Sequence, residues 1–158
     1  MEKQYIQMML ESLQKKEMVL EQLLAQSNRQ KEVLSVEDID WDSFDQITVE
    51  KGELIDELLK LDEGFETLFE RIKTPLTEQK EIYKVEIGYM QETIRSLTDK
   101  SAELEALEQR NKKMVETRLM ESRQAIKQSK MGSQAAMQYY QRMNRINTID
   151  PQLMDKKS

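Results

Sequence analysis

Apolar residues recur at intervals of three and four along most of this chain, which is the period of a helix that packs one face against a neighbour. The most regular stripe is Phe44, Ile47, Leu54, Leu58, Leu61, Phe65, Leu68 and Ile72. An earlier stripe is Ile6, Met9, Leu13, Leu20, Leu23 and Leu34. A later stripe is Tyr83, Ile87, Met90, Ile94, Leu97 and Leu104, after which the regularity is lost. The pattern therefore predicts three amphipathic helices.

Polar residues interrupt two of these stripes. Lys51 is the one polar residue on the second stripe, and the first has Lys16, Ser27 and Gln30 at the intervening positions. The first helix is therefore expected to have a less completely apolar face than the second.

Helix boundaries follow from the residues between the stripes. The first helix is expected from about Glu2 to Leu34, and Asp40 or Asp42 is the expected N-cap of the second, because a carboxylate accepts hydrogen bonds from the unpaired amides of a helix start. Pro75 disfavours helical geometry in the residue before it and suits a first helical turn. The second helix is therefore expected to end at about Lys73.

The third helix is expected to run from Leu76 to about Gln128. At 1.5 Å per residue it would be about 80 Å long, against about 50 Å for each of the others. It would then project past its neighbours, bend back or pair with a second copy. The sequence predicts an all-α fold, an antiparallel, coiled-coil-like bundle of three long helices over residues 1–130. A tail with a short amphipathic helix follows over residues 131–158.

The composition narrows the chemistry. The 158 residues suit one domain, and they include no Cys and no His, which removes disulfides, thiol catalysis and the commonest zinc ligands. The carboxylates fall on periodic solvent-facing positions without a phosphate-binding glycine loop. We therefore expect no enzyme activity, catalytic residue, cofactor or metal. No apolar run exceeds three residues, so we expect a cytoplasmic protein without membrane insertion.

Charge is unevenly distributed around a net value of −6. Residues 36–72 carry three basic and thirteen acidic side chains, whereas residues 109–145 carry nine basic and two acidic ones, where the apolar stripe is weakest. The basic stretch either pairs with an acidic neighbouring helix or forms a binding surface. Nucleic acid is not the expected partner, because the chain is acidic overall and has no base-reading motif.

The weak stripe and the tail contain the candidate partner-binding residues. Apolar and methionine side chains there alternate with polar ones, as expected of a helix that is buried only when a partner is bound, and methionine adapts to varied partners. The candidate contacts are Met114, Val115, Leu119, Ile126, Met137, Tyr140 and Met143, with Arg118 and Arg123 setting the register by charge. The alternative is that Tyr139, Tyr140 and Met143 fold back on their own bundle.

Two parts of the sequence resemble the FlgN/FliT-type flagellar export chaperones, particularly the FlgN-like proteins of Gram-positive bacteria. One is the acidic entry and second helix, DWDSFDQITVEKGELIDELLKLDEGF at residues 40–65. The other is the ending, AAMQYY at residues 135–140 and DPQLMDKK at residues 150–157. Members of this family are small, acidic, helical cytosolic proteins that hold late flagellar subunits before type III export.

The resemblance implies hook-filament junction or filament cap subunits as clients. It also implies a client-binding surface toward the C-terminal part, which corresponds here to the stretch from Asn111 and to residues 137–143. A self-associating coiled-coil adapter, in which the third helix pairs with a second copy, is the alternative function. This alternative implies a homo-oligomer.

Overall fold

The structure is a computed structural model that describes residues 2–121 and 138–143. Three long helices make up most of it: α1 (Glu2–Leu34), α2 (Trp41–Glu78) and α3 (Lys84–Glu121). A short helix follows over residues 138–143, and these described ranges contain no strand. The expected all-α bundle is confirmed.

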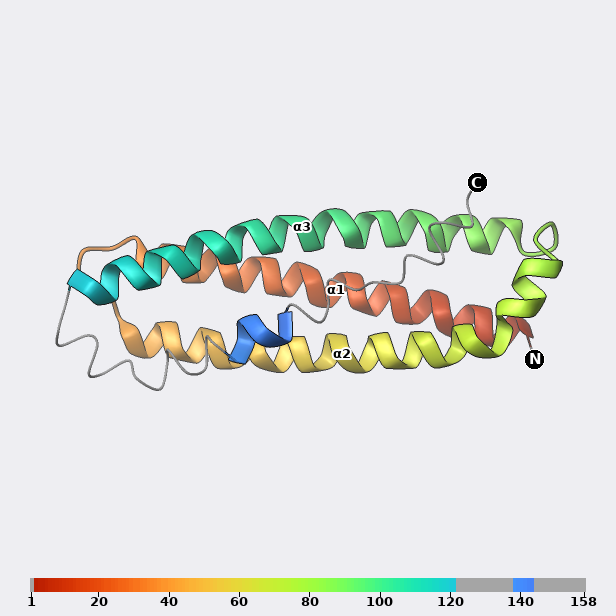
Figure 1. Ribbon diagram of the computed structural model, residues 1–158, viewed down its shortest axis with the longest axis horizontal. Coiled ribbons are helices and arrows are strands. Elements are labelled where there is room, and N and C mark those ends of the chain that lie inside the picture. The colour runs from red at the N-terminus through yellow and green to blue at the C-terminus, as the bar shows by residue number, and fades with distance from the viewer. Residues whose placement is uncertain (1, 122–137, 144–158) are drawn as a thin grey trace.

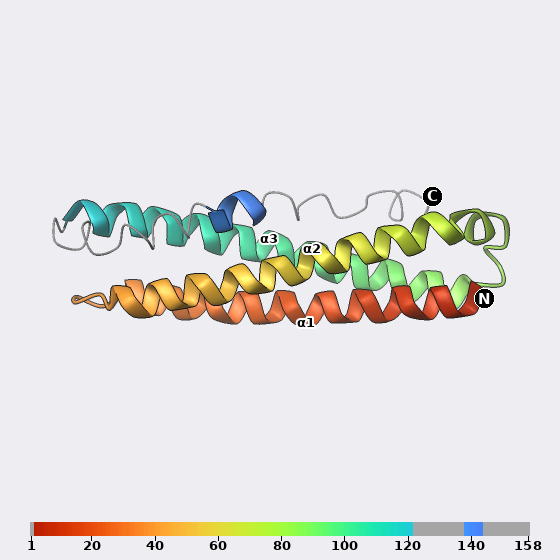
Figure 2. The ribbon, with the colours of Figure 1, turned by 90° about the horizontal axis from the view of Figure 1, so that it is seen from below.

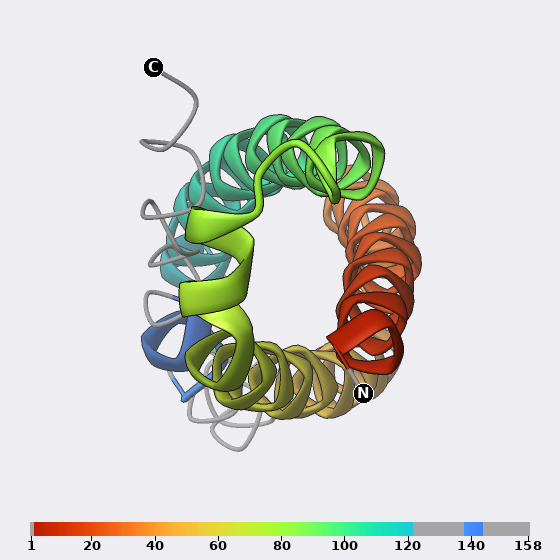
Figure 3. The ribbon, with the colours of Figure 1, turned by 90° about the vertical axis from the view of Figure 1, so that its right-hand side faces the viewer.

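The three helices are not equivalent in the bundle. The close backbone contacts are between α1 and α2 and between α1 and α3. Viewed along the long axis, residues 138–143 lie on the side of the bundle formed by α2 and α3, away from α1 (Figure 3). The border between α2 and α3 on this side is called the α2/α3 seam below.

The start of α2 follows the prediction from its capping residue. Asp40 has extended backbone geometry, and its carboxylate accepts hydrogen bonds from the Ser43 amide at 3.2 Å and the Ser43 hydroxyl at 2.8 Å. These two hydrogen bonds lower the pKa of the Asp40 carboxyl. Asp40, rather than Asp42, is therefore the N-cap.

The expected break at Pro75 is wrong. Pro75 lies inside α2, which continues to Glu78, and the Gln79 amide donates to the Pro75 carbonyl at 2.8 Å. The apolar period also continues past the proline, because Leu76 is buried in the same core as Phe69. Packing of this last turn offsets the hydrogen bond that proline cannot donate, and the end of α2 bends toward α3 (Figure 1).

The third helix consequently begins later than expected. It starts at Lys84, after a turn through residues 79–83, and the 38 residues to Glu121 equal the length of α2. Both helices are therefore about 57 Å long. Figure 2 shows α1, α2 and α3 running side by side over most of their lengths. The predicted continuation to Gln128 lies outside the described residues.

The core consists mostly of the predicted stripes, but on α2 the unpredicted Ile55 and Phe69 are buried, whereas Leu54, Leu61 and Leu68 of the predicted stripe are only partly buried. The main cluster runs along all three helices and includes Met9, Leu20, Leu23, Ile55, Leu58, Ile72, Met90, Ile94 and Leu97. A smaller cluster of Leu34, Phe44 and Val115 closes the end near the α1–α2 turn. Among residues 2–121 and 138–143, no helix is long and apolar enough to cross a membrane.

Candidate functional site

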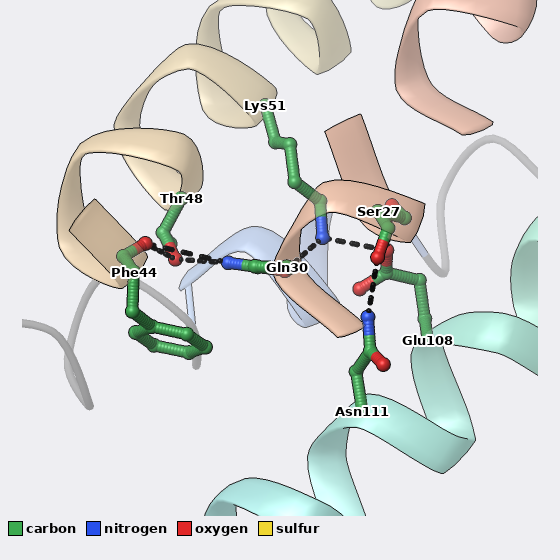
Figure 4. A network of polar contacts seen from close by, with 7 residues as sticks. All are labelled: Ser27, Gln30, Phe44, Thr48, Lys51, Glu108 and Asn111. Carbon is green, nitrogen blue, oxygen red and sulfur yellow. Dashed lines mark hydrogen bonds and ion pairs between the residues drawn. The ribbon is translucent and has the colours of Figure 1, made fainter. Parts of the chain in front are cut away.

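Three of the polar residues that interrupt the stripes, Ser27, Gln30 and Lys51, meet inside the bundle (Figure 4), whereas Lys16 pairs with Asp62 elsewhere. Each of the three helices contributes to this cluster, and the side chains are almost completely buried. Its members are Ser27 and Gln30 of α1, Thr48 and Lys51 of α2, and Glu108 and Asn111 of α3. We call these six residues the polar cluster.

Lys51 is the centre of the polar cluster. Its ammonium lies 2.6 Å from a Glu108 carboxylate oxygen and 2.6 Å from the Gln30 amide oxygen. The Gln30 amide nitrogen donates in turn to the Thr48 hydroxyl at 2.6 Å. One cation of α2 therefore links α1 and α3.

The opposite side of the cluster joins α1 to α3 directly. The Ser27 hydroxyl donates to the Glu108 carboxylate, and the Asn111 side-chain amide donates to the Ser27 backbone carbonyl at 2.9 Å. These contacts are specific to one relative height of the helices, whereas apolar side chains tolerate sliding. The polar cluster fixes the register of the bundle.

Burial dominates the electrostatics at this site. Only 1% of Lys51 is exposed, and this desolvation lowers the pKa of its ammonium, while the Glu108 carboxylate opposes the shift. A buried ion pair contributes little net stability compared with apolar packing, but removing one partner leaves an unpaired buried charge.

The short helix 138–143 covers the polar cluster from the α2/α3 seam. Tyr139 is 1% exposed, and its ring centroid lies 4.3 Å from the Lys51 ammonium. The Tyr140 ring faces Lys112 of α3, with 5.8 Å between the ammonium and the ring centroid. Two adjacent tyrosines thus contact α2 and α3, and both contacts are cation–π interactions.

A second contact fastens the same helix to α2. The Arg142 guanidinium donates to the Asp56 carboxylate at 2.6 Å and to the Gly52 carbonyl at 3.4 Å. A Cβ atom at Gly52 would lie 2.8 Å from the guanidinium, so this glycine gives Arg142 room to approach. Met143 is buried against the main core. Helix 138–143 therefore has an apolar face and a cation that pairs with α2.

Some buried polar atoms at the site that helix 138–143 covers lack a well-formed hydrogen bond. Burial raises the pKa values of the Tyr139 and Tyr140 phenols, and the nearby Glu108 carboxylate raises both further. Within the described residues, one Glu108 oxygen and the Asn111 side-chain oxygen are buried without a hydrogen bond, and the buried Tyr139 hydroxyl lies near Ser27 and Glu108 without a well-aligned one. Such atoms cost stability, so helix 138–143 binds less tightly than a fully satisfied helix of the same size.

The structure uses the candidate residues of α3 internally. Val115 is buried against Leu34 and Phe44, and Met114 and Leu119 pack around them. Arg118 donates to the carbonyls of Val36 and Glu37 in the α1–α2 turn at 2.9 and 2.7 Å. These four candidates lie at one end of the bundle, where Val115 is buried and Met114, Arg118 and Leu119 are partly buried.

The candidates in the tail have a different position. Tyr140 and Met143 lie on the α2/α3 seam and, together with Tyr139, dock on their own bundle, which is the alternative stated from the sequence. Arg123, Ile126 and Met137 lie outside the described residues. The structure thus divides the predicted surface between the α1–α2 turn and the α2/α3 seam.

Sequence reasoning did not identify the residues on which helix 138–143 sits. Lys51 was visible only as an interruption, and Glu108, Asp56 and Arg142 carried no separate signal. A comparison of the polar interruptions on the three stripes would have indicated this contact. Glu108 falls four residues after Leu104, so it continues the third stripe and would meet a cation on another helix. Such complementary polar interruptions on different helices indicate a buried contact.

Comparisons with protein-family models, curated proteins and solved structures gave no match to this chain. No group of acidic side chains in residues 2–121 and 138–143 is arranged to hold a metal ion. The α2/α3 seam and the sequence resemblance are the two features that bear on function.

Proposed function

We propose that this protein is a helix-binding chaperone, and that an amphipathic helix of its client binds along the α2/α3 seam. The observation that carries the proposal is helix 138–143 itself. It places two aromatic side chains and a methionine against α2 and α3 and pairs a cation with Asp56. A client helix with the same kind of face has the same partners available.

The physical basis is exchange of one helix for another. Within the described residues this helix contacts the bundle through Tyr139, Tyr140, Arg142 and Met143, and buried polar atoms beneath it stay unsatisfied, so a client helix that buries more apolar surface would replace it. A specific interface of standard size buries about 1,200–2,000 Å². Ordering a disordered client reduces the net affinity, which allows release.

The resemblance to flagellar export chaperones supports a particular client class. We propose late flagellar subunits, either hook-filament junction or filament cap proteins, which this protein would hold in the cytoplasm before type III export. Their terminal helices are amphipathic and would aggregate if left exposed before assembly. In this proposal the seam shields one such helix until export.

The direct test is binding of the terminal helical segments of these subunits to the full chain, measured by calorimetry and by co-purification. We expect one subunit to bind with one-to-one stoichiometry. Absence of binding by every junction and cap subunit would contradict the chaperone proposal.

Competition with helix 138–143 gives a sharper test. Arg142→Ala removes the ion pair with Asp56 and weakens the docked helix, so client affinity is expected to rise about two- to fivefold, as for loss of one partly exposed ion pair. Gln141→Ala is the matched control, because Gln141 is exposed on the same helix. Equal affinities for both variants would show that the client does not use this part of the seam.

A self-associating adapter is the rival function. Its structural support is a set of exposed apolar side chains on the long helices, including Met8, Met18, Val85 and Tyr89. Light scattering distinguishes the two functions, because a stable dimer that binds no flagellar subunit would favour the adapter.

A further inference from the structure

A cavity of about 340 Å³ lies at the end of the bundle where α2 turns into α3. Phe69, Leu76 and Met90 are its buried apolar residues, and the partly buried Ile87 also lines it. Polar residues complete the lining: Thr77, Lys80, Glu81, Lys84 and Gln91. The volume is in the range of a ligand pocket and exceeds that of one large side chain.

The local structure explains why this cavity is present. α2 bends after Pro75, and the turn through residues 79–83 separates the end of α2 from the start of α3 (Figure 1). Phe69, Leu76 and Met90 still belong to the main core, and the cavity lies beside them.

The direction of helix 138–143 relates the cavity to the seam. Its Tyr139 contacts Lys51, and three residues later Arg142 contacts Gly52 and Asp56, so the chain runs in the same direction as α2. Phe69 follows Asp56 by thirteen residues, or about 20 Å along the helix. A longer helix that follows this direction comes level with Phe69, one of the residues that line the cavity.

The charged residues at the cavity indicate which charge a group that binds there would carry. Lys80 and Lys84 are exposed at the cavity, and neither forms an ion pair with an acidic side chain within residues 2–121 and 138–143. Lys84 is also the first residue of α3, where the helix dipole disfavours a cation. Glu81 is the one acidic side chain in the cavity lining, so the lining has a net positive charge, and an incoming carboxylate would interact favourably with both lysines and with the helix start.

We propose that the cavity receives a bulky apolar side chain of the client helix, with acidic residues beside it facing Lys80 and Lys84; this inference rests on the proposed function. The client helix runs parallel to α2 and is at least about twenty residues long. It carries aromatic and basic residues near its N-terminal end and an apolar residue flanked by Asp or Glu near its C-terminal end.

Two glycines allow a matched test. A Cβ atom at Gly88 or at Gly64 would meet nothing within 4 Å, but only Gly88 lines the cavity. A helical side chain leans toward the N-terminus of its helix, so the indole of Gly88→Trp fills space beside Lys84. Gly64→Trp adds the same side chain at an exposed position of α2, and both substitutions favour helix formation.

The first readout needs no client. Anilinonaphthalene sulfonate combines an apolar ring system with an anion, and its fluorescence rises in apolar sites. We expect the full chain and Gly64→Trp to enhance this fluorescence, and Gly88→Trp to reduce the enhancement at least fivefold. Lack of enhancement by the full chain, or equal enhancement by both variants, would overturn the proposal.

The second readout uses the subunit helix that binds the full chain. Its affinity is expected to fall about tenfold or more in Gly88→Trp and to stay unchanged in Gly64→Trp, because one large apolar side chain loses its burial. Unchanged affinity in Gly88→Trp would overturn the cavity inference and leave the chaperone proposal intact.

Other outcomes separate the two proposals. If no subunit helix binds, but the dye signal is lost only in Gly88→Trp, the chaperone proposal fails and the cavity remains an acceptor for an apolar anionic group. If Gly88→Trp alone abolishes a concentration-dependent dimer, the occupant is a second copy and the client inference is overturned.

Discussion

At the scale of the residue, Lys51 shows how one side chain serves two purposes. Its ammonium holds Glu108 and Gln30 inside the bundle, and the same group faces the ring of Tyr139. The residue that fixes the helix register is therefore also part of the surface that helix 138–143 covers. Substitutions here change both stability and docking.

Breaking this ion pair on one side is expected to be costly. Lys51→Met should lower the free energy of unfolding by about 3–5 kcal/mol, because Glu108 is left buried without its cation. Lys51→Met combined with Glu108→Leu should recover most of that loss. Urea unfolding followed by circular dichroism measures both effects.

The control is Lys60→Met, which changes an exposed lysine of the same helix and should alter stability by less than about 0.5 kcal/mol. A loss for Lys51→Met no larger than the control would mean that Glu108 is not buried with its cation. A double variant as unstable as the single one would mean that the packing, not the charge, sets the cost.

At the scale of the element, α2 contains a proline that disfavours helix locally, and tertiary packing stabilises the helix around it. Pro75 cannot donate a hydrogen bond to the carbonyl four residues earlier, yet the burial of Leu76 and Phe69 extends the helix beyond it. The bend that results contributes to the cavity at the α2–α3 turn. The element is therefore determined by its apolar stripe more than by its proline.

Pro75→Ala is expected to raise the free energy of unfolding by about 1–3 kcal/mol, since it restores the missing donor and removes the clash. It should also reduce the bend and, with it, the fluorescence of anilinonaphthalene sulfonate. Urea unfolding and dye titration of the same samples give the two quantities. Increased stability with an unchanged dye signal would show that the bend does not depend on the proline.

At the scale of the whole molecule, a short helix from beyond α3 completes the seam between two helices that make their main contacts with α1. Its docking depends on groups from every neighbour: Ser27 of α1, Lys51 of α2, and Glu108, Lys112 and Glu116 of α3. Several of these groups are ionisable, so the docking equilibrium should depend on pH.

Alkaline pH is expected to release helix 138–143. Burial raises the pKa of Tyr139 and of Tyr140 in the docked state, so their contribution is fully present below the undocked value of about 10 and is lost as the pH rises above it. The chain has no Cys, so a spin label on Gln141→Cys reports this helix alone, and its mobility should increase between about pH 9 and pH 11.

The variant that tests the cause carries Tyr139→Phe and Tyr140→Phe. It keeps the rings but removes the phenolic protons, so the label should remain immobile over most of the same pH range. Release of the double variant at the pH of the parent chain would instead assign the transition to loss of the proton on Lys51, whose pKa burial lowers.

The sequence by itself determined the helices and their inward faces. Periodicity depends on which residues are apolar, and this is a local property, so the bounds of α1 and the cap at Asp40 followed from it. The prediction failed at Pro75, because a local rule about one residue was outweighed by the burial of Leu76, which depends on the whole bundle.

Only the tertiary structure decided the site. Lys51 and Gln30 were visible as polar residues on apolar stripes, but their partners depend on the relative heights of three helices, which no single stripe contains. For the same reason, the sequence did not reveal that Val115 and Leu119 lie at the end near the α1–α2 turn, whereas Tyr140 lies on the α2/α3 seam. Packing between helices brings residues from distant parts of the chain into contact, and local sequence patterns do not specify which of these residues meet.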